Sequence, residues 1–442
     1  MTEFINTYIL GMGVPILLIF SGIFYGIETK FFYIRHPMVM IRAMLKKPDK
    51  DGISPARAVT LALAGTLGVG NIVGVSSAIF LGGFGAIFWM WISALAAMVL
   101  KYAEIVLAVN HRRVGKDGSY HGGAMYYIID CFSNVRVRRI GYAVAGIFAI
   151  LCIIDSITMG CVIQINAVSR AFLGVFDIPV VLTGIILAPL TAVIISGGAK
   201  GISSVTEKLV PIMTVGYIVM SIAVMVIRRD ALGDAVGQIF AGAFSPKSTV
   251  GGVVGFVMSR SLRYGTMRGL VSNEAGCGTA PIAHAASNTR NPAEQGFWGI
   301  FEVFVDTIVL CTMTAIVIII SYDSVKIYGN DSIMMTIRAY SAVLGDWAEY
   351  FMCIAVLLFG FATVICWAHY GSECVRYLTR RKMFKWIYVA VYSGFVVVGA
   401  VAAPDSVWTA ADLAIGAMTI INISVILRMR PEVKRITSNY FS

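Results

Sequence analysis

The chain has 442 residues, of which 58% are hydrophobic and only 13% are charged, with a formal net charge of +11. Soluble domains carry about 25% charged residues, so this composition excludes an ordinary soluble protein and indicates an integral membrane protein. Apolar runs of about 20 residues recur along the chain, which predicts membrane-spanning helices and not the alternating strands of a β-barrel. The expected fold class is therefore all-α integral membrane.

The apolar runs predict eleven transmembrane helices. The first follows a start without Lys or Arg and without an obvious cleavage site, so we expect a retained helix and not a signal peptide. The predicted spans lie near residues 7–27, 56–82, 84–109, 140–172, 179–197, 208–228, 250–280, 297–321, 347–375, 385–403 and 407–428.

Lys and Arg concentrate in alternate connections. One set of loops holds most of them, including Lys46, Arg112, Arg138 and Arg380, and the opposite set holds few, such as Lys326. The positive-inside rule makes the basic loops cytoplasmic, with the N-terminus outside and the C-terminus inside. The net charge therefore reflects membrane topology, and we expect a lipid bilayer and no nucleic acid as partner.

The spans suggest an accessory helix followed by two sets of five. Residues 1–55 would form the accessory helix and a cytoplasmic loop, 56–228 the first five-helix repeat, and 229–428 an extracellular link and the second repeat. Residues 429–442 would form a cytoplasmic tail. Five spans reverse the orientation of the second copy, and many secondary transporters are inverted repeats of this kind.

Glycines interrupt the first helix of each set. In Leu63–Val75, Gly65, Gly68 and Gly70 crowd together with Thr66 and Asn71, and Arg268–Pro281 repeats the combination of glycines with Asn. Small residues can also reflect close helix packing. Because the two segments occupy matching positions, we expect discontinuous first and sixth core helices that flank a binding site.

A broken helix exposes groups suited to a zwitterion and a cation. Half-helix N-termini favour a carboxylate, and freed carbonyls and half-helix C-termini suit Na⁺. The backbone of Gly68, Val69 and Gly70, with the side chains of Thr66 and Asn71, is the first candidate site.

Other polar residues lie within the predicted helices. Gln164 has groups for both an ammonium and a carboxylate, although an interhelical hydrogen bond explains it equally well. Thr363 and Trp367 share one helix face, where threonine suits an alkali cation and tryptophan could wall a pocket or simply pack in the core.

Several charged residues are also expected at membrane depth. Asn273 and Glu274 lie in the second break, where Glu274 either serves function or caps the exposed N–H groups. Lys101 and Glu104 are expected to form a structural pair near the cytoplasmic surface. Further buried acids without assigned partners are Asp155, Glu302, Asp306 and Glu373.

The sequence gives little support for an enzymatic function. The sequence has no P-loop, its histidines are scattered, and its eight cysteines form no C-x-x-C pair, so we expect the cysteines to fill the core. We expect no catalytic residues and no ATP-driven step.

Motifs along nearly the whole core resemble the alanine/glycine:cation symporter family (sodium:alanine symporter), which comprises sodium-coupled carriers of small neutral amino acids in bacteria and archaea. The resemblance is carried by Gly68-Val-Gly-Asn-Ile-Val-Gly74, Leu81-Gly-Gly-Phe-Gly-Ala-Ile-Phe-Trp-Met-Trp91, Lys101-Tyr-Ala-Glu104, Gly122-Gly-Ala-Met-Tyr-Tyr127, Glu207-Lys-Leu-Val-Pro211, Arg268-Gly-Leu-Val-Ser-Asn-Glu-Ala-Gly276, Ala280-Pro-Ile-Ala-His-Ala285, Gln295-Gly296, Trp367 and Tyr370-Gly371.

The resemblance implies a leucine-transporter-like 5+5 inverted repeat in a prokaryotic cell membrane, with substrate and Na⁺ between the broken helices. The sequence departs from the family pattern at four positions, Val69, Val271, Phe84 and Ala124. The resemblance therefore does not fix the shape of the pocket. The substrate-binding candidates are Thr66, Gly68, Val69, Gly70, Asn71, Gln164, Val271, Ser272, Thr363 and Trp367. The sodium candidates are Thr66, Asn71, Asn273 and Thr363.

These expectations combine in a secondary active transporter, a monomer that imports alanine or glycine with Na⁺ as the coupling ion. The alternatives are a proton-coupled amino acid carrier that uses Glu274 or Asp155, and a channel or membrane-embedded sensor.

Overall fold

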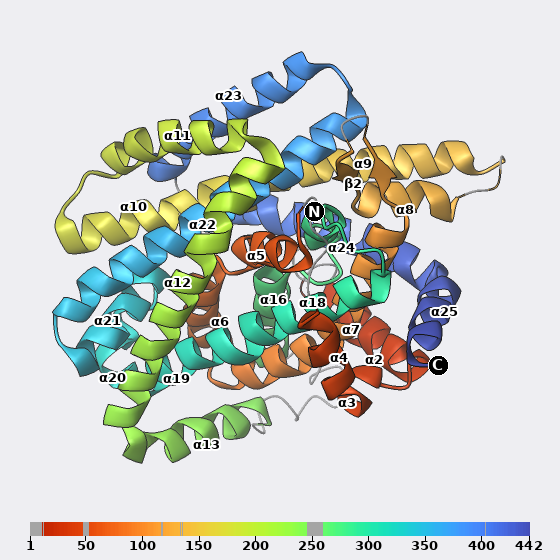
Figure 1. The fold of residues 1–442 in the computed structure, drawn as a ribbon. Coiled ribbons are helices and arrows are strands. Elements are labelled where there is room, and N and C mark those ends of the chain that lie inside the picture. Colours follow the sequence, from red (N-terminus) through yellow and green to blue (C-terminus); the bar gives the residue numbers. More distant parts are fainter. Residues whose placement is uncertain are drawn as a thin grey trace.

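The computed structural model describes residues 11, 13–46, 53–115, 118–132, 134, 136–244, 260–402 and 404–442, with the side chains of 404–406 left aside. The described chain is almost wholly helical (Figure 1). Its one sheet pairs β1 (Arg113–Val114) antiparallel with β2 (Tyr120–His121).

The first half of the chain contains both long and interrupted helices. Three of its segments, like two in the second half, have a label beginning with η, which marks a π-helical or 3-10 turn. The elements are α2 (Val14–Glu28), α3 (Phe32–Arg35), α4 (Pro37–Met44), α5 (Pro55–Thr66), η2 (Gly70–Gly74), α6 (Val75–Gly82), α7 (Gly85–Asn110), α8 (Ala124–Cys131), α9 (Arg138–Ile157), η3 (Thr158–Val162), α10 (Ile163–Phe176), α11 (Val180–Ser196), α12 (Gly198–Ile227), η4 (Arg229–Ala231) and α13 (Leu232–Ala243).

The second half repeats the combination of a broken helix with long spans. Its elements are α16 (Arg260–Asn273), α17 (Ala280–Ala285), α18 (Pro292–Val303), η5 (Phe304–Cys311), α19 (Thr312–Ile320), α20 (Tyr322–Val325), η6 (Lys326–Tyr328), α21 (Ser332–Leu344), α22 (Trp347–Leu378), α23 (Lys382–Val401), α24 (Pro404–Arg428) and α25 (Arg430–Phe441).

The described helices agree with the predicted spans. Seven helices are long and apolar enough to cross a membrane, and α5 with η2–α6 forms an eighth span bent by 49°. The shorter apolar helices α2 and α11 fall on two more predicted spans. The predicted spans 7–27 and 250–280 begin among residues outside the described part, and α16 with α17 covers the end of the second. Helices α13, α20 and α21 lie in connections where none was predicted.

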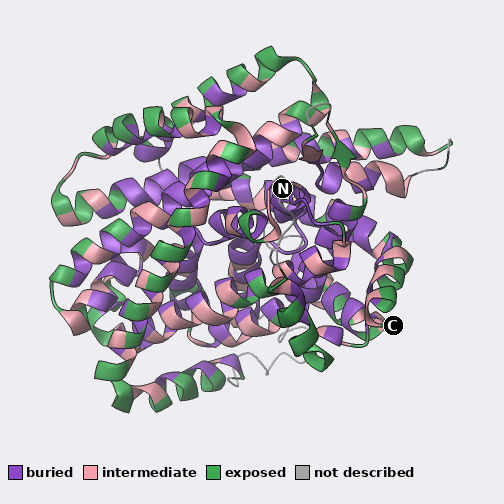
Figure 2. Ribbon diagram, viewed as in Figure 1, coloured by how far each residue is buried: buried purple, intermediate pink, exposed green. Residues whose placement is uncertain are grey.

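Helix α7 lies at the centre of the bundle. In the most apolar stretch of this helix 89% of the residues are buried. The helix packs against α16, α18 and α2. In contrast, α11 and α23 pack on each other at the periphery, and their outward faces are exposed (Figure 2). These faces carry exposed apolar side chains such as Ile186, Val193 and Val398, as lipid-facing helices do. All eight cysteines are free, and seven are buried, as expected of residues that fill a core.

The two broken helices run in opposite directions beside each other. Helix α5 packs against α17, and α6 packs against α16, so the first half of each broken helix faces the second half of the other. Such an antiparallel pair is what an inverted repeat produces. The repeat boundaries at 56–228 and 229–428 stay a prediction.

Candidate binding site between two broken helices

The first break offers backbone N–H groups to a side chain from another span. After α5 ends at Thr66, the N–H of Val69 donates to Gln164 Oε1 at 3.0 Å. The amide of Gln164 is held in turn, because its Nε2 donates to the carbonyl of Met159 at 3.1 Å. Gln164 therefore replaces the helical hydrogen bond that the break removes.

Gly68 is required where three elements meet. A Cβ at this position would lie 2.5 Å from Thr363 Oγ1 and 2.9 Å from Gln164 Oε1, closer than real side chains approach. The Thr363 hydroxyl itself donates to the carbonyls of Ala64 (2.9 Å) and Phe359 (3.1 Å). The structure thus brings together Gly68, Gln164 and Thr363, three substrate-binding candidates that lie in three separate predicted spans.

Trp367 forms an apolar wall one turn beyond Thr363. Its side chain is buried and packs edge-on against Tyr370, with ring centroids 5.4 Å apart. Gly160 in the π-helical turn η3 lies against this tryptophan, where any side chain would overlap it. Val271 is also buried, in α16 next to Ser272, and the Cα of Ser272 lies 3.8 Å from where a Cβ of Gly70 would be.

Glu104 caps the second break. Glu274 has φ +52°, Gly276 +81° and Gly278 +82°, so the chain leaves helical geometry through left-handed positions. The N–H groups of Gly276 (3.3 Å) and Gly278 (3.1 Å) both donate to the Glu104 carboxylate. The capping role considered for Glu274 thus belongs to Glu104, while Glu274 accepts a 2.7 Å hydrogen bond from the Thr279 hydroxyl.

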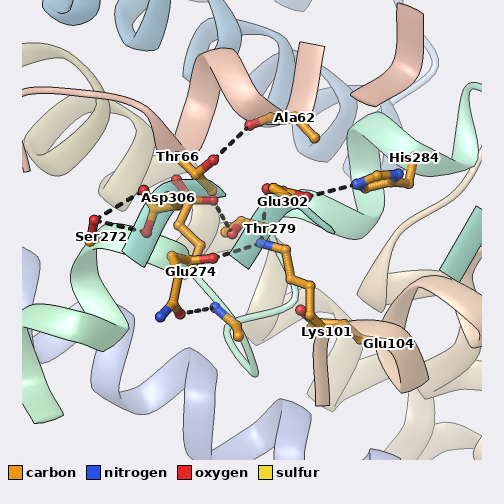
Figure 3. A network of polar contacts seen from close by, with 12 residues as sticks. Ala62, Thr66, Lys101, Glu104, Ser272, Glu274, Thr279, His284, Glu302 and Asp306 are labelled. Carbon is orange, nitrogen blue, oxygen red and sulfur yellow. Dashed lines mark hydrogen bonds and ion pairs between the residues drawn. The ribbon is translucent and has the colours of Figure 1, made fainter. Parts of the chain in front are cut away.

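The expectation of a surface pair between Lys101 and Glu104 is wrong. Both side chains are fully buried, and Lys101 forms an ion pair with Glu302 at 3.1 Å. Lys101 also donates to the carbonyl of Asn273 at 2.7 Å, so an ammonium group occupies the half-helix C-terminus considered for Na⁺. Glu302 continues the network to His284 at 2.9 Å (Figure 3). The burial of Lys101 is possible because Glu302 supplies its counter-charge. Glu302 belongs to α18, which is far from α7 along the sequence but packs against it.

The four sodium candidates differ in how their oxygen atoms are used. The Thr66 hydroxyl donates a hydrogen bond to the carbonyl of Ala62 at 3.4 Å. The Thr363 hydroxyl donates to the two carbonyls given above. The Asn273 Oδ1 accepts from the N–H of Ala275 at 3.0 Å. Asn71 Nδ2 donates to Asp306 Oδ1 at 2.7 Å, while its own Oδ1 is buried without a hydrogen-bond partner among the described residues.

Asp306 lies between the two breaks, a position that the sequence does not predict. It was expected only as a buried acid, yet it contacts Asn71 beside the first break and Ser272 beside the second. The π-helical turns η2, η3 and η5 contain or adjoin Asn71, Gln164 and Asp306. Such turns often mark functional sites, but the sequence carries no simple signal for them.

A cavity of about 370 Å³ lies beside this region. It extends from Val73 after the first break to Ile163 next to Gln164, and towards Asp331 at the start of α21. The Arg268 guanidinium lies over the Trp408 ring in its wall, 4.7 Å from the ring centroid. The cavity therefore adjoins the elements that carry the candidate residues, and its lining includes Asp331 from a connection that the sequence predicts to lie opposite the basic loops.

Solved structures share this architecture. A Na⁺-coupled sialic acid symporter in a substrate-bound outward-open state aligns with a TM-score of 0.58 at 13% identity, covering 96% of this chain and 87% of that one. A manganese transporter from Eremococcus coleocola aligns with a TM-score of 0.52 at 12% identity, covering 88% and 85%. These likenesses confirm the expected all-helical, leucine-transporter-like fold.

Comparison with related sequences identifies the family of transporters. The sodium/alanine symporter AgcS of Methanococcus maripaludis is 34% identical over 433 residues, which cover 95% of this chain and 92% of that protein. The probable sodium/glutamine symporter GlnT of Bacillus subtilis is 33% identical over 428 residues, covering 96% and 87%. A model of the sodium:alanine symporter family matches residues 1–442. The chain is thus a membrane transporter and not an enzyme, and it belongs to the sodium:alanine symporter family.

Proposed function

We propose that the protein imports a small neutral amino acid, alanine or glycine, together with Na⁺. The observation that carries this proposal is the meeting of Gly68, Val69, Gln164 and Thr363 at the first break. Gln164 Oε1 accepts the Val69 N–H in the position that a substrate carboxylate would take at a half-helix N-terminus. A shift of the Gln164 amide would free this N–H and let Gln164 contact the substrate directly.

The size of the substrate is argued from the apolar wall. Tyr370 lies against Gly65 of the first break, and Trp367 packs edge-on against Tyr370. Val69 and Val271 replace the residues typical of the family pattern. The name of AgcS supports alanine, whereas the name of GlnT shows that a relative of similar identity is assigned a larger side chain. We therefore expect alanine or glycine to be carried faster than glutamine.

The cavity supplies a route to the site in the proposed orientation. With the basic loops in the cytoplasm, it opens towards the outside, and the substrate would enter past Arg268 and Asp331. Alternating access would follow from the rocking of a helix bundle around the broken helices of a single, monomeric chain. An inward-negative membrane potential adds about 2.3 kcal/mol per charge per 100 mV to Na⁺ entry.

Uptake of radiolabelled amino acids into proteoliposomes tests this function. Alanine should accumulate under an inward Na⁺ gradient and not when choline replaces Na⁺, and glycine should compete with it better than glutamine. Accumulation that is indifferent to Na⁺ would contradict the coupling, and preferred uptake of glutamine would contradict the substrate.

One buried acid favours a second candidate, a proton-coupled carrier. Both carboxylate oxygens of Asp155 are buried without a hydrogen-bond partner among the described residues. A carboxyl group in this state within a membrane helix suits a transported proton. Uptake driven by a pH gradient in the absence of Na⁺, and lost in Asp155→Asn, would select this function.

A further inference from the structure

The connection between α2 and α5 carries positive charge only. Residues 29–48 contain no Asp or Glu, and their basic side chains are Lys30, Arg35, Arg42, Lys46 and Lys47. The positive-inside rule predicts that this connection lies in the cytoplasm, where anionic lipids give the membrane surface a negative potential. The short helices α3 and α4 belong to this connection, and the transport site does not use them.

The backbone holds these two helices in a defined place. Lys30 and Phe31 both have left-handed geometry, with φ +58° and +48°, so the helical path of α2 ends there. The next residue, Phe32, is buried, and its ring centroid lies 4.7 Å from that of Tyr102 in α7 and 6.0 Å from that of Phe297 in α18. Helix α4 also packs against α18. The connection is therefore anchored to the bundle directly after the first span.

Helix α4 has one buried side and one exposed apolar side. Met40 and Ala43 are buried, whereas Met38, Ile41 and Leu45 are 67%, 48% and 77% exposed. The exposed side chains are spaced by three and four residues, which places them along one side of a helix. An exposed apolar side next to the end of a membrane span is suited to contact with lipid.

Two arginines of this connection are exposed and keep their charge available. Lys46 pairs with Glu294 of α18, but neither Arg35 nor Arg42 forms an ion pair within the described part of the chain. A guanidinium group binds phosphate oxygens in a bidentate manner and is hydrated more weakly than an ammonium group. Apolar side chains next to free arginines are typical of a helix that lies in the membrane interface.

We propose that α4 lies in the cytoplasmic membrane interface and that Arg35 and Arg42 bind the phosphate groups of anionic phospholipids such as phosphatidylglycerol. Met38, Ile41 and Leu45 contact the acyl chains of these lipids. Charge complementarity selects this occupant, because residues 29–48 offer no acidic side chain to a basic partner. A second copy of the chain would bring like charges together at the same surface.

Thermal unfolding in nanodiscs of defined composition tests this surface. The wild type should have a higher Tm in an equal mixture of phosphatidylglycerol and phosphatidylcholine than in phosphatidylcholine alone. Salt should reduce the difference, because it screens exposed charges. The double variant Arg35→Gln/Arg42→Gln should lose more than half of the difference. The matched control, Arg229→Gln/Lys326→Gln, removes two exposed cations from connections predicted to be extracellular and should keep it.

Several outcomes would overturn the lipid surface. A wild type that gains no stability from phosphatidylglycerol, a double variant that keeps the gain, or an equal loss in the control would each do so. The same rise of Tm with soluble glycerol phosphate would assign the arginines to free anions instead. A gain seen only in nanodiscs that hold two copies of the chain would assign the apolar side to a second copy.

A single variant decides if the double variant does not fold. Arg42→Gln should then lose a quarter or more of the gain in Tm from phosphatidylglycerol, and a smaller loss overturns the inference. None of these measurements depends on transport, so the proposed function is tested separately.

Discussion

At the scale of single residues, Gln164 has the most direct test. Replacing it with Glu keeps the shape of the side chain but places a negative charge where a substrate carboxylate would bind. Because like charges in a buried site cost several kcal/mol, we expect KM for alanine to rise more than tenfold. Proteoliposome uptake measures this, with Gln238→Glu on the exposed face of α13 as the control. A normal KM in Gln164→Glu would remove Gln164 from the site.

Gly68 provides a residue-scale test of packing. A methyl group at this position would meet Thr363 and Gln164 within 2.9 Å, and such overpacking costs about 1–3 kcal/mol. Thermal unfolding of the purified protein should therefore show a lower Tm for Gly68→Ala. Gly74→Ala is the matched control, because no atom lies within 4 Å of its added Cβ. Equal Tm values for the two variants would show that the first break has more space than described.

At the scale of elements, the second break depends on Glu104. Its carboxylate accepts from Gly276, Gly278 and the Asn422 side chain, the last at 2.9 Å. Glu104→Gln would turn an amide donor towards other donors, and we expect about 2 kcal/mol or more of lost stability. Glu28→Gln, which removes only a partly exposed ion pair with Lys434, should cost less than about 1 kcal/mol. Comparable thermal shifts in the two variants would contradict the role of Glu104.

The elements also show what the sequence could predict. The long spans follow from apolar length alone, and both breaks follow from glycines that repeat in matching positions. The partners of Lys101 and Asp306 could not be predicted, because they depend on α18 and η5 crossing α7 and the breaks at particular levels. Helices α13, α20 and α21 were missed because they lie in connections, where no membrane-length apolar run signals a helix.

At the scale of the whole molecule, the C-terminal helix α25 is tied to the rest of the bundle through His111. Its ring nitrogens contact Asp130 (2.8 Å) and Glu432 (3.0 Å), and Arg113 and Asn110 complete the cluster. Burial lowers the pKa of His111, but the two carboxylates outweigh burial and leave this pKa above its ordinary value. The hydrogen bond from His111 holds the pKa of Glu432 below its ordinary value.

These pKa shifts predict how stability depends on pH. A raised histidine pKa contributes stability at low pH that is lost as the pH rises through the folded-state value, and the lowered pKa of Glu432 keeps its contribution until acid protonates it. From pH 7 to 9 the Tm of the wild type should therefore fall by about 1–2 °C more than that of His111→Gln. Parallel pH profiles for the two proteins would show that the cluster does not hold α25.

The burial of the native cysteines has a practical consequence for chemical labelling. Seven of the eight thiols lie inside the bundle, so a reagent that cannot cross the bilayer has little to modify on the wild type except Cys131. A single new thiol, such as Ser77→Cys in the cavity wall, would then report its own accessibility without prior removal of the others. Modification of that thiol from the outside of intact cells, and its protection by Na⁺ with alanine, would follow the transporter through its cycle.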